Sequence, residues 1–300
     1  MIRRSLCLIA VAVVSFAATM TRLPSSPPHP HPPTADVAVA PKLPSTAKPD
    51  LATLAQTDPI ALLDECRSRY ATSIRGYKAT LVKRERVHGV LHEDEVVRVW
   101  IRDEPYAVLM LWQSGSREVK LGGFSLGRIE GVLYAVGENK GDMLAWRPDA
   151  KFLSTTRINP TSDQAQAASR YCIAEGGLSH AMERTYLAWS EARERGQLKW
   201  DFLGTKPIEK AGGRVCHVVR RTCVEPVLDP FLMHDPKPDA KTRPADAFRT
   251  IAIMIDAEMG LQVGSRLERD GELIGEYYFR DLELNPSFGK EQFKPAALKK

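Results

Sequence analysis

Between residues 77 and 121 the chain contains three consecutive segments rich in Val, Leu, Tyr and Trp, separated by short polar breaks at Gly89 and Pro105. In the first two segments apolar positions recur at every second residue, so each predicted strand has one consistently apolar face. Residues 118–121 have the composition of a fourth strand. The pattern predicts an antiparallel meander with one side turned toward a core.

The third segment, residues 106–112, is apolar on both faces. A strand of this kind is covered on both sides, so we expect its second face to meet a helix, another chain or a ligand. A functional surface is predicted there.

Charged residues continue the alternation of the meander. Lys83 and Glu85 extend the first strand beyond its apolar half, and Arg98 and Arg102 share a face with Trp100. Such residues are typical of cross-strand pairs on a solvated face, which is what we expect here. A site for an anionic head group is the alternative.

Two amphipathic helices are predicted. The first follows Asp58, an N-cap with Pro59 at the first helical position, and runs for about four turns toward Gly76. The second spans residues 177–197, where apolar side chains recur at helical spacing and charged side chains lie on the other face. Each helix needs an apolar surface to cover.

Short strands are predicted on both sides of the helical middle, within residues 122–156 and 198–284. Asp270-Gly271 is the residue pair that a type I′ hairpin turn requires. Two meanders therefore flank the helical region.

The first 49 residues differ in character from the rest. Residues 1–21 combine two arginines with a short apolar run, the pattern of a secretory signal peptide or of a retained N-terminal anchor. Residues 22–49 are rich in Pro without periodicity, which predicts a disordered linker. We expect an exported protein of the periplasm or cell envelope, tethered to the membrane if the anchor is retained, with residues 50–300 as a single domain.

The net charge of +5 is concentrated near the N-terminus. Five basic residues and one acidic residue lie in residues 1–48, so the remainder carries 37 basic and 36 acidic residues. A nearly neutral domain argues against nucleic acid as a partner.

Four cysteines, Cys66, Cys172, Cys216 and Cys223, would remain after signal cleavage, an even number for an oxidising compartment. Cys216 and Cys223 cannot bridge within one extended strand, because seven residues span roughly 20 Å. A bridge across a turn, a Cys66–Cys172 bridge and buried thiols remain open.

Catalytic patterns are scarce. Gly123 to Gly127 matches the G-x-S-x-G motif of hydrolases around Ser125, but strand composition follows it where the motif requires a helix. His217 beside Cys216 is the nearest approach to a metal pair, yet neighbouring strand residues face opposite sides of a sheet. We therefore predict no cofactor, no metal and no enzymatic activity.

Three stretches resemble exported bacterial proteins of domain-of-unknown-function family 1571. They are YKATLVKRERVHG at 77–89, PYAVLMLW at 105–112 followed by Arg117-Glu118, and GELIGEYYFRDLELN at 271–285 followed by Phe293. More distantly, the order of elements is similar to that of the periplasmic lipoprotein carrier and sorting proteins, the LolA and LolB type.

The resemblance implies an α+β fold, in which a strongly curved antiparallel sheet forms an incomplete barrel and helices cover its concave face. It also implies an apolar cavity for acyl chains. The aromatic and aliphatic residues of the strands are our candidate lining residues: Trp100, Leu109, Leu111, Trp112, Tyr134 and Trp146.

The first functional hypothesis is a non-enzymatic carrier-like protein that binds a lipid or the acyl chain of a lipoprotein. The second is a module that contacts another envelope protein or acts as a sensor without a ligand. A hydrolase using Ser125 is the third.

Overall fold

The computed structural model describes residues 50–121, 124–150, 154–234 and 243–299. Backbone contacts divide the chain into Met1–Ala47 and Lys48–Lys300, and all of the description below concerns the second unit. The predicted signal or anchor and the Pro-rich linker lie outside the described residues. Among the residues described, no helix has both the length and the apolar character needed to cross a membrane.

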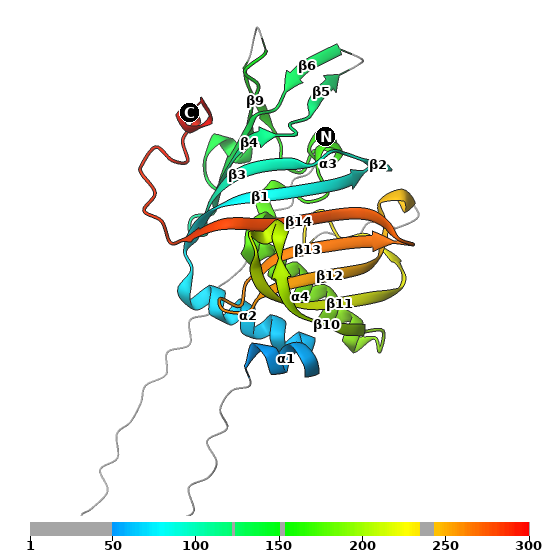
Figure 1. The fold of residues 1–300 in the computed structure, drawn as a ribbon. Coiled ribbons are helices and arrows are strands. Elements are labelled where there is room, and N and C mark those ends of the chain that lie inside the picture. Colours follow the sequence, from blue (N-terminus) through cyan, green and yellow to red (C-terminus); the bar gives the residue numbers. More distant parts are fainter. Residues whose placement is uncertain (1–49, 122–123, 151–153, 235–242, 300) are drawn as a thin grey trace, which may run out of the picture. The chain divides into compact units, whose positions relative to one another are not determined.

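Twelve strands form one antiparallel sheet that curls strongly but does not close (Figure 1). Along the sheet the order is β10 (Lys199–Ile208), β11 (Arg214–Val227), β12 (Phe248–Asp256), β13 (Gln262–Arg269), β14 (Glu272–Leu284), β1 (Gly76–Val87), β3 (Glu95–Arg102), β4 (Ala107–Ser114), β7 (Gly131–Ala135), β8 (Met143–Trp146) and β9 (Thr155–Ile158). The short strand β2 (Val90–Leu91) pairs with β1. The predicted curved antiparallel sheet is confirmed.

The centre of the sheet is the seam where β1 pairs with β14. Tyr77 lies opposite Leu284 and Glu85 opposite Gly275, so the first strand of one meander is joined to the last strand of the other. The β13–β14 hairpin turns at Asp270 and Gly271, both with positive φ, as the sequence predicts. The two meanders therefore form one continuous surface.

The predicted fourth strand of the first meander was placed wrongly. Residues 118–121 form β5 (Glu118–Leu121), which pairs with β6 (Phe124–Arg128) in a separate two-stranded sheet, and β7 takes the place beside β4. The chain leaves the sheet at Gly115, where φ is +74° and an added Cβ would lie 2.1 Å from the carbonyl oxygen of Asp94. Only glycine can make this turn.

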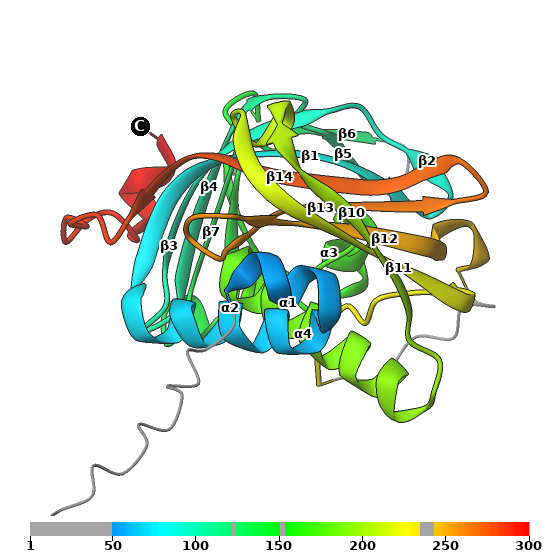
Figure 2. The same cartoon turned by 60° about the horizontal axis from the view of Figure 1, so that its bottom comes forward.

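Helices cover the concave face (Figure 2). They are α1 (Leu51–Thr57), α2 (Pro59–Ser73), α3 (Asp163–Ala168) and α4 (Gly177–Glu194). The Asp58 carboxylate caps α2 by accepting the backbone N–H groups of Ile60 and Ala61, each at 3.0 Å. Arg67 of α2 and Glu183 of α4 form an ion pair at 2.6 Å, which joins the two helices that cross the sheet.

The buried face of α4 is the apolar stripe that its helical spacing predicts. Leu178, Met182 and Trp189 are at most 1% exposed and belong to the main core cluster, together with the inward side chains of the strands. Tyr186, which the sequence places on the same stripe, is only partly buried and lies 4.0 Å beneath the Arg67 guanidinium.

Two tyrosines of the first meander hold the first turn of α4 and the residues just before it. The Tyr77 hydroxyl accepts the backbone N–H of Leu178 at 2.8 Å, and the Tyr106 hydroxyl donates to the carbonyl oxygen of Ile173 at 3.0 Å. Gly177 is required here, because its φ is +90° and an added Cβ would lie 2.6 Å from Ile101 Cδ1. The start of α4 is thus pressed against the inner surface of the sheet.

All four cysteines of the domain carry buried thiols. Cys216 and Cys223 both lie on β11, which excludes a bridge between them for the geometric reason given above.

Gly177→Ala should lower the free energy of unfolding by roughly 2–3 kcal/mol, because the new methyl group meets both strain at positive φ and a steric clash. Urea unfolding measures the loss. Gly137→Ala is the matched control, since Gly137 has φ +82° and no atom within 4 Å of an added Cβ. Equal losses in the two variants would contradict the close approach at Gly177.

Candidate functional site

A cavity of about 1070 Å³ lies between the concave face of the sheet and the helical segments α3 and α4. Its walls include β1, β3, β4, β7 to β9 and β11 to β14 of the sheet, residues 160–189, and Asp229 and Phe231. Its volume is at the upper end of the range typical of ligand pockets. A void of this size makes it the candidate functional site.

Strand register arranges the sheet side of the cavity in rows. Lys83 lies opposite Glu95 at one end, and Val99 lies opposite Met110 further along the strands. The last row pairs Ile101 with Val108. Along β1, β3 and β4 the cavity wall therefore changes from charged to apolar.

The charged end is the mouth. The exposed side chains of the lining cluster in the connection before β3, in β5 and β6, and in α3: Glu93, Glu118, Arg128, Asp163, Gln164, Ala167 and Ala168. At the other end the wall includes Ile173, Gly176 and Gly177, where the start of α4 is bound to Tyr77 and Tyr106. The apolar end is thus closed by a hydrogen-bonded turn.

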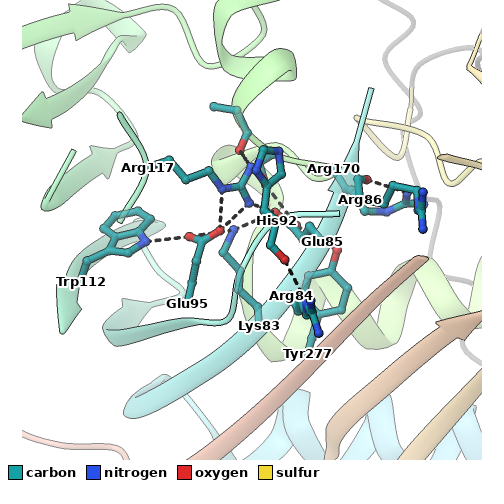
Figure 3. A network of polar contacts seen from close by, with 12 residues as sticks. Lys83, Arg84, Glu85, Arg86, His92, Glu95, Trp112, Arg117, Arg170 and Tyr277 are labelled. Carbon is teal, nitrogen blue, oxygen red and sulfur yellow. Dashed lines mark hydrogen bonds and ion pairs between the residues drawn. The ribbon is translucent and has the colours of Figure 1, made fainter. Parts of the chain in front are cut away.

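Four charged side chains, three buried and one partly buried, stand just inside the mouth (Figure 3). Lys83 Nζ lies 2.8 Å from Glu85 Oε2 and 3.5 Å from Glu95 Oε2. Arg117 donates from Nη2 to Glu85 Oε2 at 3.1 Å and from Nε to Glu95 Oε1 at 2.8 Å. We call these four residues the charge cluster.

Neutral donors complete the charge cluster. Trp112 Nε1 donates to Glu95 at 2.7 Å, and the Tyr277 hydroxyl donates to Glu85 at 2.9 Å. Arg117 Nη1 donates to the carbonyl oxygen of Ala168 at 3.1 Å, which joins the cluster to the end of α3. Buried charges are tolerated when they are paired and hydrogen-bonded in this way.

The electrostatics of the charge cluster keep Lys83 and Glu85 ionised. Burial opposes ionisation of Glu85, but the charge and hydrogen bond of Lys83 and the charge of Arg117 lower its pKa to about 2. Burial lowers the pKa of Lys83, but the carboxylates of Glu85 and Glu95 raise it by more, so that the pKa of Lys83 lies above its usual value. Glu85 and Lys83 are therefore charged at any pH near neutrality.

The expectation that Lys83 and Glu85 face solvent is wrong, since they are 6% and 1% exposed. On β1 they continue the inward row of Tyr77, Ala79 and Leu81, so strict alternation of the strand carries them into the cavity wall. That alternation is visible in the sequence. Glu95, Arg117 and Tyr277 carry no such signal, because their contacts depend on three further segments.

Arg98 and Arg102 lie on the opposite face of the sheet. The guanidinium of Arg98 is exposed and 4.9 Å from the Trp100 ring, and that of Arg102 is 5.0 Å from the Phe293 ring. These are contacts of the convex surface, as expected for a solvated face.

Of the six residues proposed from sequence to line a cavity, Trp112 lies in its wall. Four pack together on the convex face with Phe293 and the C-terminal turn η5 (Pro295–Lys299): Trp100, Leu109, Leu111 and Trp146. Tyr134 packs against Tyr106, with ring centroids 6.2 Å apart. The doubly apolar strand β4 therefore has the cavity on one face and η5 on the other.

The candidate catalytic and metal-binding residues lie on β6 and β11. Ser125 lies inside β6, opposite Lys120 of β5, and no helix follows it. His217 is 5% exposed with Nδ1 2.8 Å from the Thr205 hydroxyl, and burial lowers its pKa. Within the described residues no group of three or more His, Cys, Asp or Glu side chains could hold a metal ion.

Glu85→Gln should lower the free energy of unfolding at neutral pH by on the order of 3 kcal/mol, because it leaves buried cations short of a partner. The carboxylate contributes stability that is fully present above its unfolded pKa near 4.5 and is lost as the pH falls toward its folded pKa of about 2. The difference between the wild type and the variant should therefore shrink over that interval in urea titrations.

The control for this variant is Glu283→Gln, which removes an exposed carboxylate paired with Lys78 at 2.8 Å. It should cost less than about 1 kcal/mol. A loss in Glu85→Gln no larger than in this control would show that the charge cluster does not stabilise the fold.

Comparisons with known proteins give one family and several distant structures. The model of the family described as "Protein of unknown function (DUF1571)" matches residues 74–299. No curated protein matches the sequence.

Among solved structures, the chain is similar to MucB, with 13% identity and a TM-score of 0.40; the match covers 79% of this chain and 63% of MucB, so the chain spans less than two thirds of that protein. It is similar to LprF from Mycobacterium bovis, with 12% identity, a TM-score of 0.43 and coverage of 76% of this chain and 94% of LprF. It is also similar to a LolA superfamily protein from Nitrosomonas europaea, with 7% identity, a TM-score of 0.27 and coverage of 79% and 99%.

The family match begins just before β1 and ends in η5, so it includes every strand of the sheet and both ends of the cavity. The chain therefore belongs to the family of proteins described as DUF1571.

Proposed function

We propose that the protein is a non-enzymatic binding protein of the cell envelope that holds the apolar chains of a lipid or of a lipidated protein in its cavity. The observation that carries the proposal is the apolar inner part of a cavity of about 1070 Å³. The charged mouth and the apolar interior match the two ends of an amphiphile, with its chains inside and its head at the charge cluster.

The energetics of such binding need no specific polar contact. Each buried methylene contributes about 0.8 kcal/mol, so a long chain is held by the walls alone. Val99, Met110 and Val132 supply those walls at paired positions of the neighbouring strands β3, β4 and β7, and Phe279 adds to them from β14. Trp112 stands between this surface and the charge cluster, where an aromatic ring with a polar N–H suits the boundary.

The available space favours more than one chain. A water molecule takes roughly 30 Å³ in the liquid, and a methylene group is of similar size. A cavity of about 1070 Å³ thus has room for roughly 35 such groups. This is enough for the two chains of a membrane lipid.

Location in the envelope rests on the sequence of residues 1–49, which lies outside the described residues. A signal peptide or retained anchor followed by a Pro-rich linker would place the cavity outside the cytosol, close to a membrane. Contact with another envelope protein is compatible with this role, because a carrier needs a donor and an acceptor.

Protein purified from a bacterial envelope under mild conditions should carry one or more lipid-sized adducts in native mass spectrometry, because the apolar wall retains them. Organic extraction should remove the adducts and deliver lipid to the solvent phase. A uniformly ligand-free protein that also fails to take up lipid from vesicles would overturn the proposal.

Met110→Trp should lower lipid occupancy several-fold, since Met110 is partly exposed to the cavity and a larger side chain fills that space. Leu111→Trp is the matched control on the same strand, because Leu111 points to the convex face and packs there against η5. Occupancy is measured by native mass spectrometry beside thermal unfolding. If both variants retain lipid equally at unchanged stability, the cavity is not the binding site.

A further inference from the structure

The inner wall of the cavity holds equal numbers of basic and acidic side chains. The charged lining residues that are not exposed are Lys83, Arg117, Arg184 and Arg221 on the basic side and Glu85, Glu95, Glu175 and Asp229 on the acidic side. Burial, followed by the positive charge of Arg117, lowers the pKa of His92, so this histidine is neutral near pH 7. Among the described residues, the wall presents no surplus of either charge to a ligand.

The charged groups of the charge cluster already have ion-pair and hydrogen-bond partners within the protein. Glu85 Oε2 accepts from Lys83 at 2.8 Å and from Arg117 at 3.1 Å, and Glu95 accepts from Arg117 at 2.8 Å and from Trp112 at 2.7 Å. A head group with a net charge would have to take one of these partners and leave a buried charge behind. That exchange is strongly unfavourable in a site withdrawn from water.

Charged side chains of the opposite wall also have partners within the protein. Arg184 donates to the Glu175 carbonyl oxygen at 3.3 Å, with its guanidinium 4.4 Å from the Tyr171 ring. Asp229 accepts the Tyr171 hydroxyl. Arg221 donates to a carbonyl oxygen of α4 at 3.1 Å. Each of these charged side chains therefore has at least one partner within the protein, while the buried Nε–H groups of Arg184 and Arg221 have none among the described residues.

The mouth itself is acidic. Among the side chains that the structure describes, the exposed lining residues there include the acidic Glu93, Glu118 and Asp163 and one basic residue, Arg128. Exposed charges of one sign repel ligands of the same sign as they approach, and this effect weakens with added salt. An anionic head group is thus opposed at entry as well as inside.

From these observations we infer that the cavity selects amphiphiles whose head group has no net charge, either uncharged or zwitterionic, over anionic amphiphiles with the same chains. The inference rests on the proposed function and names the class of ligand for that site. Selection by charge comes from the charge cluster and the acidic mouth, while the apolar interior contributes equally to both classes.

The test offers the full chain vesicles that contain equal amounts of a phosphocholine lipid and a phosphoglycerol lipid with identical chains. After re-isolation of the protein, native mass spectrometry gives the ratio of the bound lipids. At low ionic strength the zwitterionic lipid should exceed the anionic one at least about threefold, the size expected for a few exposed charges. The ratio should fall when salt is added.

The double variant Glu93→Gln with Asp163→Asn should reduce this ratio, because it removes two acidic charges at the mouth. Asp281→Asn with Glu283→Gln is the matched control: it changes the net charge equally on β14, where both side chains are exposed and outside the cavity lining. The control should keep the wild-type ratio.

Equal uptake of the two lipids would overturn this inference and leave the proposed function standing. An anionic preference that disappears in Arg221→Met would overturn it and identify that guanidinium as an anion site. Uptake of neither lipid would overturn the proposed function and this inference together.

Discussion

The structure depends on the alternation of one strand, β1, which pairs with β3 on one side and β14 on the other. Its inward row runs from Tyr77, which holds the start of α4, through Leu81 to Lys83 and Glu85 at the mouth. One extended segment therefore contributes the closed end, the apolar wall and the charged rim of the cavity. Side chains on a strand alternate between its two faces. A shift of register by one residue would therefore turn the inward side chains of β1 outward and place its outward charged and small side chains in the cavity wall.

Much of the architecture could be predicted from the sequence, where local signals are strong. Asp58 before Pro59 marks the start of α2, and Asp270-Gly271 marks a hairpin turn, because each depends only on neighbouring backbone geometry. The position of residues 118–121 was not predictable in this way. Whether a short strand joins the main sheet depends on Gly115 and its contact with Asp94, two residues that are distant in the sequence and flank β4 and β3.

The lining of the site was harder to predict, for a reason that β4 makes clear. Met110 and Leu111 are both apolar, and composition alone does not tell which of them faces the concave side. The C-terminal turn decides the matter, since Phe293 and Leu298 cover the Leu111 face and leave Met110 to the cavity.

The charge cluster posed the opposite problem. Lys83 and Glu85 occupy inward positions of the alternating pattern, although their charge predicts exposure to solvent. Tertiary contacts bring in the partners Glu95 and Arg117, and these partners make the burial of the two charges tolerable.

The seam between β1 and β14 also sets an order of events for the growing polypeptide. Tyr77 pairs with Leu284, 207 residues further along the chain, so the central strand lacks one neighbour until that much more of the chain has been made. Sheets with such distant strand pairings form slowly, because the entropy cost of closing a long loop comes before the stabilising free energy of the pairing. The cavity wall that β1 and β14 build together is therefore among the last parts of the domain to form.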